Sequence, residues 1–220
     1  MSQVIFVKTY EEPIFCEREI LRYAGCKKTD VGMEALLKEC IEEAREKLTY
    51  KVCYIELPVT IEEHTCDFDV FRVQSEKLTR YLRGCDRAVV FAATVGVEMD
   101  RLIAKYSRLS PSKALFFQAL GAERIEALCD RFCEDMATQF GQKALSRFSP
   151  GYGDLPLSCQ KDIFSVLDCE RKIGLTLNDS LLMSPTKSVT AFMGIGGDDG
   201  PHIHKCSACD MKNCAFRGML

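Results

Sequence analysis

Ten residues, from Arg147 to Pro156, combine side chains that could bind a small ligand. They hold two glycines, two prolines, two aromatic rings and a single cation, Arg147. The planar guanidinium group of an arginine can donate two parallel hydrogen bonds to a carboxylate or a phosphate. Glycine and proline are also common in plain connections, so composition alone leaves two interpretations, a linker or a shaped binding loop.

A second set of possible ligands lies in residues 202–214, which contain three cysteines and two histidines. The glycine-rich segment 196–201 precedes them and is predicted to be a flexible linker, which would let the tail 202–220 wrap around an ion. The cysteines follow the C-x2-C-x4-C spacing that is typical of metal ligands: Cys206, Cys209 and Cys214.

Three alternatives remain open for this Cys-rich tail. An iron–sulfur cluster would use the three cysteines, with Cys159 or Cys169 conceivable as a fourth ligand. A structural zinc ion would instead take His204 or His202 as its fourth ligand. In the third alternative the tail binds no metal and keeps reduced thiols, the default for cysteines in a cytosolic protein.

The whole chain has the composition of a soluble globular protein, with 47% hydrophobic and 28% charged residues among 220. A net charge of −3 gives no indication of a nucleic-acid partner. No apolar run approaches the roughly 20 residues of a membrane-spanning helix, and the N-terminus lacks the basic start and cleavage site of a signal peptide. These features predict a cytoplasmic protein whose thirteen cysteines are mostly buried, reduced thiols.

The longest predicted element is a helix from Pro111 to Gln139, which leads toward the loop. Ser110 and Pro111 favour a helix start, as N-cap and first helical residue. Apolar residues then recur at helical spacing as far as Met136, which is typical of a helix that packs on a core. Most of its acidic residues are interpreted as solvent-facing, whereas Glu126 borders the apolar stripe.

Shorter elements accompany this helix. A continuous apolar run from Ala88 to Ala93 predicts a strand buried on both faces. Strands and helices occur in separate runs along the chain, which favours an α+β fold over a repeating βαβ sheet. The other predicted strands are 4–7, 52–57, 61–63, 68–73 and 188–195. The other predicted helices are 17–24, 32–48, 76–83, 98–107 and 158–173, with Ser75 and Ser158 as the N-caps of helices 76–83 and 158–173.

Three segments, in this order along the chain, resemble the activation domain of cobalamin-dependent methionine synthase. The first is Arg147-x-x-x-Gly151-Tyr152, the pattern with which that domain binds S-adenosylmethionine. The second is residues 168–180, a helix end at Ile-Gly followed by Leu-Thr-Leu-Asn-Asp-Ser. The third is residues 183–189, which match the family's Met-x-Pro-x-x-Ser-Val. The resemblance is best over residues 85–195.

The resemblance implies an α+β domain over residues 1–195, with a twisted, mainly antiparallel sheet and packed helices that include one long central helix. Residues 196–201 would then be the linker, and 202–220 the Cys-rich tail. The chain contains none of the homocysteine, folate or cobalamin domains of a full methionine synthase, and no Asp-x-His-x-x-Gly cobalamin motif. We therefore expect a free-standing activation-domain protein.

The resemblance also implies a site for S-adenosylmethionine. Arg147 would bind the carboxylate of the ligand, and Tyr152 would place its ring face against the sulfonium or methionine end. Gly151 would allow the backbone to approach the ligand closely. Backbone groups of Gly153 and Asp154 would complete the cradle.

Acidic residues complete the family's site. One is a glutamate on the preceding long helix, and Glu126-Ala127-Leu128 is its match in the local sequence. Glu126 is therefore expected either to bind the ribose or the ammonium group of the ligand or to support another residue that contacts the ligand. Another acidic residue, near the start of the family's domain, has no clear counterpart in this chain.

The function implied by the resemblance is the reductive reactivation of a cobalamin-dependent methionine synthase or a related corrinoid protein. Inactive cobalamin on that partner takes one electron, from a donor such as flavodoxin or ferredoxin, and is then methylated by S-adenosylmethionine. The protein would act as a component of that enzyme by positioning the methyl donor. The alternative is a metal- or iron–sulfur-containing interaction or electron-transfer protein for another corrinoid methyltransferase.

Overall fold

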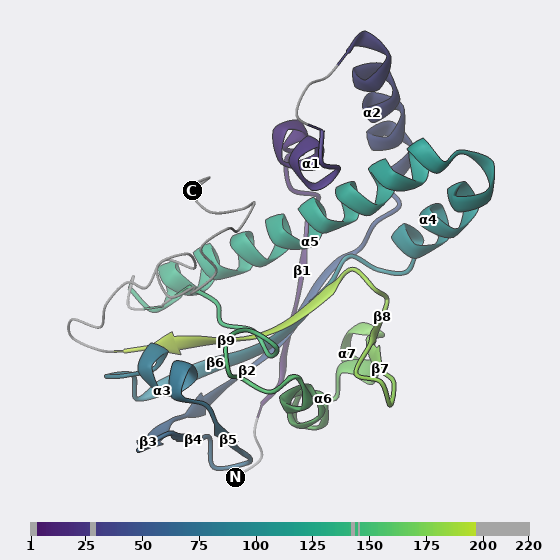
Figure 1. Ribbon diagram of the computed structural model, residues 1–220. Helices are drawn as coiled ribbons and strands as arrows, with labels where there is room; N and C mark the ends of the chain where they lie inside the picture. Colours follow the sequence, from purple (N-terminus) through teal and green to yellow (C-terminus); the bar gives the residue numbers. More distant parts are fainter. Residues whose placement is uncertain (1–3, 27–29, 142–143, 145, 197–220) are drawn as a thin grey trace.

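The computed structural model describes residues 4–26, 30–141, 144 and 146–196. Its centre is a sheet in which neighbouring strands run antiparallel, in the order β1-β2-β6-β9 (Figure 1). These strands are β1 (Phe6–Tyr10), β2 (Tyr50–Pro58), β6 (Arg87–Thr94) and β9 (Ser188–Ile195). The following parts of the prediction lie outside the described residues: linker residues 197–201, and the tail with Cys206, Cys209, Cys214, His202 and His204.

The sheet is covered on both faces, as the apolar run of β6 predicted. Every position from Ala88 to Thr94 is buried, and alternate side chains enter opposite layers because strand side chains have a period of two. Phe91 packs in the first layer, together with the long helix. Val90 packs in the second layer, on the other face of the sheet.

The first layer is helical and is dominated by α5 (Pro111–Gln139), the predicted long helix, which crosses the sheet (Figure 1). The Ser110 hydroxyl accepts a hydrogen bond from the amide of Lys113 (3.5 Å), and Pro111 is the first helical residue, as predicted. The helix predicted over 32–48 ends earlier, at Ala44. The other helices of this layer are α1 (Glu17–Tyr23), α2 (Val31–Ala44) and α4 (Glu98–Leu109).

The second layer corrects the prediction of a single helix over residues 158–173. Ser158 lies in a 3-10 turn and caps no helix, and Asp168 adopts φ 49°, which interrupts the helical path. Aspartate tolerates this left-handed conformation better than most residues. Of the predicted strand 68–73, only residues 72 and 73 lie in a strand. The elements outside the main sheet on this side are β3 (Thr60–Glu62), β4 (Thr65–Asp67), β5 (Arg72–Gln74), α3 (Glu76–Tyr81), the 3-10 turn Leu157–Cys159, α6 (Gln160–Leu167), α7 (Cys169–Ile173), β7 (Thr176–Leu177) and β8 (Met183–Ser184).

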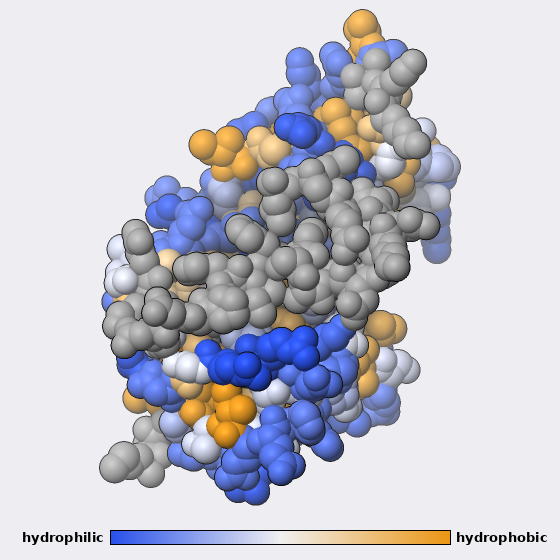
Figure 2. Space-filling view, turned by 60° about the vertical axis from the view of Figure 1, so that its left-hand side comes forward, coloured by the Kyte–Doolittle hydropathy of each residue, from blue (hydrophilic) through white to orange (hydrophobic). Residues whose placement is uncertain are grey.

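Apolar side chains also reach the surface, in separate places. On the face drawn in Figure 2, orange hydrophobic areas alternate with blue hydrophilic side chains. Ile14 is 94% exposed, in the segment that joins β1 to α1. Within the ranges that the structure describes, no helix is both long enough and apolar enough to cross a membrane.

Candidate functional site

The segment 147–156 is a folded loop and not a plain linker. The Gly151 amide donates to the carbonyl of Leu155 (2.9 Å), and the Leu155 amide donates to the carbonyl of Tyr152 (3.1 Å). Gly151 and Gly153 have φ values of 84° and 64°, a region that glycine adopts without steric cost. The two glycines are therefore required by the turn itself.

The loop begins as an extension of the sheet at the β9 edge. Phe148 and Phe192 of β9 exchange two backbone hydrogen bonds of 2.8 Å each. Consecutive side chains of an extended segment point to opposite faces. Phe148 therefore enters the second layer, where its ring centre lies 5.2 Å from that of Tyr81. Arg147 points the other way, toward α5.

Arg147 meets two carboxylates of α5. Its Nη2 lies 2.5 Å from Oε2 of Glu126, and its Nη1 contacts Oδ1 of Asp130. The Arg147 side chain is only 6% exposed, whereas that of Glu126 is 40% exposed and that of Asp130 is 62% exposed. Burial alone would lower the pKa of Arg147, but Cys129, Glu126 and Asp130 outweigh burial and raise it. The guanidinium group is therefore held in its charged form.

The structure thus brings together two of the predicted ligand residues, Arg147 and Glu126, in direct contact. Sequence reasoning missed Asp130, which was interpreted as a solvent-facing charge. Its spacing of four residues from Glu126 places both on one face of a helix, and this was the available signal. The register of Arg147 against that face depends on how the loop pairs with β9, which no local pattern contains.

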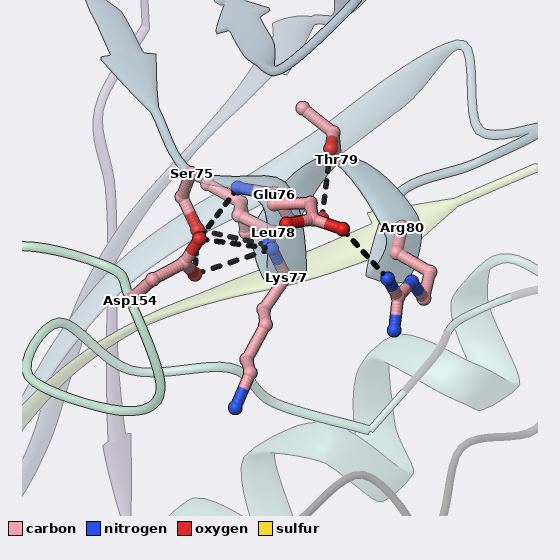
Figure 3. Close-up of polar contacts among 7 residues, drawn as sticks. All are labelled: Ser75, Glu76, Lys77, Leu78, Thr79, Arg80 and Asp154. Carbon is pink, nitrogen blue, oxygen red and sulfur yellow. Dashed lines mark hydrogen bonds and ion pairs between the residues drawn. The ribbon is translucent and has the colours of Figure 1, made fainter.

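The Asp154 side chain joins the loop to α3 (Figure 3). It accepts hydrogen bonds from the Ser75 hydroxyl (2.6 Å) and from the backbone amides of Glu76 (2.7 Å) and Lys77 (3.1 Å). Partial burial would raise the pKa of Asp154, but these hydrogen bonds outweigh it and lower the pKa below its ordinary value of 3.8. Ser75 also caps α3 as predicted, by accepting from the Leu78 amide. The Asp154 carboxylate therefore has a structural role that sequence reasoning did not anticipate.

Tyr152 is half-buried and packs against the second layer, away from the α5 face that Arg147 meets. Its ring meets the ring of Phe148 edge-on, with centres 5.4 Å apart and an interplanar angle of 85°. A side chain at Gly151 would place its Cβ 3.3 Å from Cδ1 of Leu157, which is tighter than an ordinary contact. The packing around Tyr152 thus fixes the orientation of its ring within the loop.

A groove of about 830 Å³ lies beside Asp130, between α5 and the N-terminal part of the chain. The Tyr10 hydroxyl donates to Asp135 (2.9 Å) at this groove, a contact between residues 125 positions apart. This separation explains why sequence analysis did not identify the groove. Its walls are residues 8–14 on one side and, on α5, Ala127, Asp130, Arg131, Glu134 and Asp135.

A buried ion pair of α5 holds the N-terminal wall of the groove in place. The Arg124 side chain is 0% exposed; its Nη2 lies 2.5 Å from Glu123 Oε1 and donates to the carbonyl of Ile14 (2.8 Å). Nη1 of Arg124 contacts the carbonyl of Pro13. Glu123 in turn accepts a hydrogen bond from the amide of Cys16 (3.2 Å). Two consecutive residues of α5 therefore position the segment from Pro13 to Cys16.

Across the described ranges, no three side chains of His, Cys, Asp or Glu are placed to hold a metal ion together. Cys159 and Cys169, the conceivable fourth ligands of a cluster, are 3% and 1% exposed. Burial raises the pKa of the Cys159 thiol to about 12, which disfavours the thiolate that a metal needs. The three alternatives for the Cys-rich tail remain predictions, because its ligands lie outside the described residues.

A solved structure with a similar fold is the crystal structure of the MetH reactivation domain bound to AdoHcy. The TM-score is 0.66 at 16% sequence identity, and the match covers 90% of this chain and 80% of that chain. This likeness confirms the predicted α+β fold, with its antiparallel sheet and one long helix, α5. No curated protein sequence matches this chain.

The family relationship comes from the sequence itself. The family model described as "Vitamin B12 dependent methionine synthase, activation domain" matches residues 79–199. This range contains β6, α5, the loop 147–156 and β9, and it spans more than half of the 220 residues. The chain therefore belongs to the family of the activation domain of vitamin B12 dependent methionine synthase.

Proposed function

We propose that this protein binds S-adenosylmethionine through Arg147 and the loop 147–156, and presents its methyl group to a cobalamin on a partner protein. The observation that carries the proposal is the setting of Arg147: a nearly buried guanidinium whose carboxylate partners face solvent. A guanidinium group next to solvent-facing carboxylates can exchange one of them for the carboxylate of a ligand, through the same terminal nitrogen.

The choice of ligand is supported by the family and by one relative in fold. The MetH reactivation domain was solved with S-adenosylhomocysteine (AdoHcy) bound. That molecule is S-adenosylmethionine without its sulfonium methyl group, so the two share the amino-acid group, the ribose and the adenine. The amino-acid group carries a carboxylate suited to Arg147 and an ammonium suited to Glu126.

In the proposed reaction the S–CH3 bond of S-adenosylmethionine breaks, its electron pair stays on sulfur, and the methyl group passes to the reduced cobalamin of the partner. The residues of this chain have no proton to move in that step. Their task is to hold the sulfonium with its methyl group directed at the partner. The Tyr152 ring would stabilise the positive charge by about 0.5–2 kcal/mol.

The loop is suited to this task because it is already folded. Its internal hydrogen bonds and the Asp154 anchor on α3 hold Gly151 and Tyr152 in place. A site that is organised before binding loses less conformational entropy when the ligand arrives. This reduces the free-energy cost of binding and keeps the methyl donor in one orientation.

The cobalamin in this proposal belongs to a methionine synthase or a related corrinoid protein, outside these 220 residues. The reducing electron comes from a further partner such as flavodoxin or ferredoxin. Mixing the protein with S-adenosylmethionine labelled in its methyl group, a candidate corrinoid protein and a one-electron reductant tests this arrangement. Label on the corrinoid fraction that requires the protein supports the proposal, and label that appears equally without the protein contradicts it.

Ligand binding is tested first, by isothermal titration of the full chain with S-adenosylmethionine. We expect binding in the micromolar range that is lost in Arg147→Met, because the methionine side chain keeps the bulk and removes the charge. The matched control is Arg171→Met on α7, where the arginine side chain is 83% exposed and pairs with Asp168. Equal binding by Arg147→Met and Arg171→Met would overturn the proposed site.

A further inference from the structure

We propose that Asp130 is an internal competitor for the ligand: it occupies the position on Arg147 that the carboxylate of S-adenosylmethionine takes on binding. This inference rests on the proposed function and adds a residue to it. Neither the sequence pattern nor the resemblance singled out Asp130. Asp130 is distinguished by its contacts, its exposure and its position in the fold.

The first step is that Arg147 needs an internal partner when no ligand is bound. Its side chain is 6% exposed. A guanidinium group at that depth is strongly destabilised if it is left without a negative partner. The protein therefore supplies carboxylates of its own, from Glu126 and Asp130.

The second step is that the two carboxylates are not equivalent. Each contacts a different terminal nitrogen of Arg147, so one can leave while the other remains. Asp130 is 62% exposed and Glu126 40%. The more exposed carboxylate loses less free energy when it leaves Arg147 for water. Asp130 is therefore the carboxylate that a ligand displaces.

The third step is the route of the ligand. Asp130 lines the groove of about 830 Å³, whereas Glu126 does not. Arg147 does not line the groove either, but its Nη1 contacts Asp130. A ligand carboxylate that reaches Nη1 from the groove would therefore have to take the place of Asp130. The Asp130 side chain is 62% exposed, so it can rotate into solvent when a ligand displaces it.

The charges at the site also favour one class of ligand. Two carboxylates around one guanidinium group carry a net charge of −1. A ligand that brings only a carboxylate would add another negative charge, whereas a zwitterionic amino-acid group adds none. With Asp130 in solvent, Glu126 remains near Arg147 and can pair with the ammonium group. The site thus fits a ligand that ends in an α-amino acid.

The test compares the full-length wild type with Asp130→Asn, by isothermal titration with AdoHcy and with 5′-methylthioadenosine, which lacks the amino-acid group. If Asp130 competes with the ligand carboxylate, its removal raises the affinity for AdoHcy. We expect a gain of roughly twofold to fivefold, the range of an exposed ion pair. The affinity for 5′-methylthioadenosine should stay unchanged.

The control variant is Glu134→Gln, which removes a charge from the same groove at a residue that pairs with Arg131 and not with Arg147. Weaker or unchanged AdoHcy binding by Asp130→Asn overturns the inference, and so does an equal gain in Glu134→Gln. If the wild type binds neither ligand, the proposed function itself fails. These outcomes distinguish an error in the role of Asp130 from an error in the proposed binding function.

Discussion

Two arginines meet carboxylates of the same helix, α5, in opposite settings. Arg124 and Glu123 are 0% and 5% exposed. Arg147 is almost as deeply buried, but its partners Glu126 and Asp130 are 40% and 62% exposed. The pairs use the same chemical groups, so the difference lies in what surrounds the carboxylates.

The exposure of the carboxylates distinguishes a structural ion pair from a candidate binding site. Arg124 gives its hydrogen bonds to Glu123 and to the backbone carbonyls of Pro13 and Ile14. A ligand could reach it only by displacing the chain. The partners of Arg147 can turn to water, so that exchange with a ligand requires only a side-chain rotation. Exposure of the counter-ions is thus the feature that makes one arginine a candidate ligand site.

The largest effect is expected for Arg124→Met, which leaves the Glu123 carboxylate buried without its cation. We expect a loss of about 3–5 kcal/mol in the free energy of unfolding. Urea denaturation followed by circular dichroism measures it. The double variant Glu123→Gln/Arg124→Met removes both charges and should recover part of the loss. A single variant as stable as the wild type would show that this pair is not structural.

Arg147→Met should cost less stability, about 1–2 kcal/mol, because the exposed side chains of Glu126 and Asp130 can hydrate once the cation is gone. The same denaturation experiment measures the difference. The variant should nevertheless lose S-adenosylmethionine binding completely. The comparison fails if Arg147→Met is destabilised as much as Arg124→Met, since Arg147 would then also be a structural residue.

A smaller, pH-dependent effect is expected for Asp154→Asn. Because hydrogen bonds lower the pKa of Asp154 in the folded state, its stabilisation is present above the ordinary value of 3.8 and is lost as pH falls through the lower folded pKa. The variant should be about 1 kcal/mol less stable at neutral pH, a modest value because the carboxylate is exposed. The free energies of unfolding of the wild type and of Asp154→Asn should converge as the pH falls through the acid range. Asp179→Asn, at another exposed turn, serves as the control.

The smallest effect on stability is expected for Asp130→Asn, within about 0.5 kcal/mol of the wild type, because Glu126 still pairs with Arg147. Thermal unfolding of the two proteins measures this difference. A small stability effect together with a change in AdoHcy affinity would sharpen the contrast with Arg124. A large loss of stability would place Asp130 with the structural carboxylates.

Much of the fold could be predicted because its signals are local. The Ser110–Pro111 start of α5, the buried run of β6 and the Ser75 cap of α3 each depend on neighbours within one helical turn or along one strand. The helix predicted over 158–173 was wrong because its apolar spacing continues through Asp168, although the backbone there turns left-handed. Periodicity records which side chains are apolar and does not record such an interruption.

The sequence by itself determined that residues 147–156 carry an arginine, two glycines and a tyrosine in the order of one family, and it predicted Glu126 as their companion. Only the tertiary structure decided what surrounds them. The pairing of Phe148 with Phe192 turns Arg147 toward α5, where it meets Asp130 as well as Glu126. The Asp154 side chain reaches α3, 79 positions away from Ser75. The physical reason is that side-chain direction follows strand pairing, which joins residues that are remote in the chain.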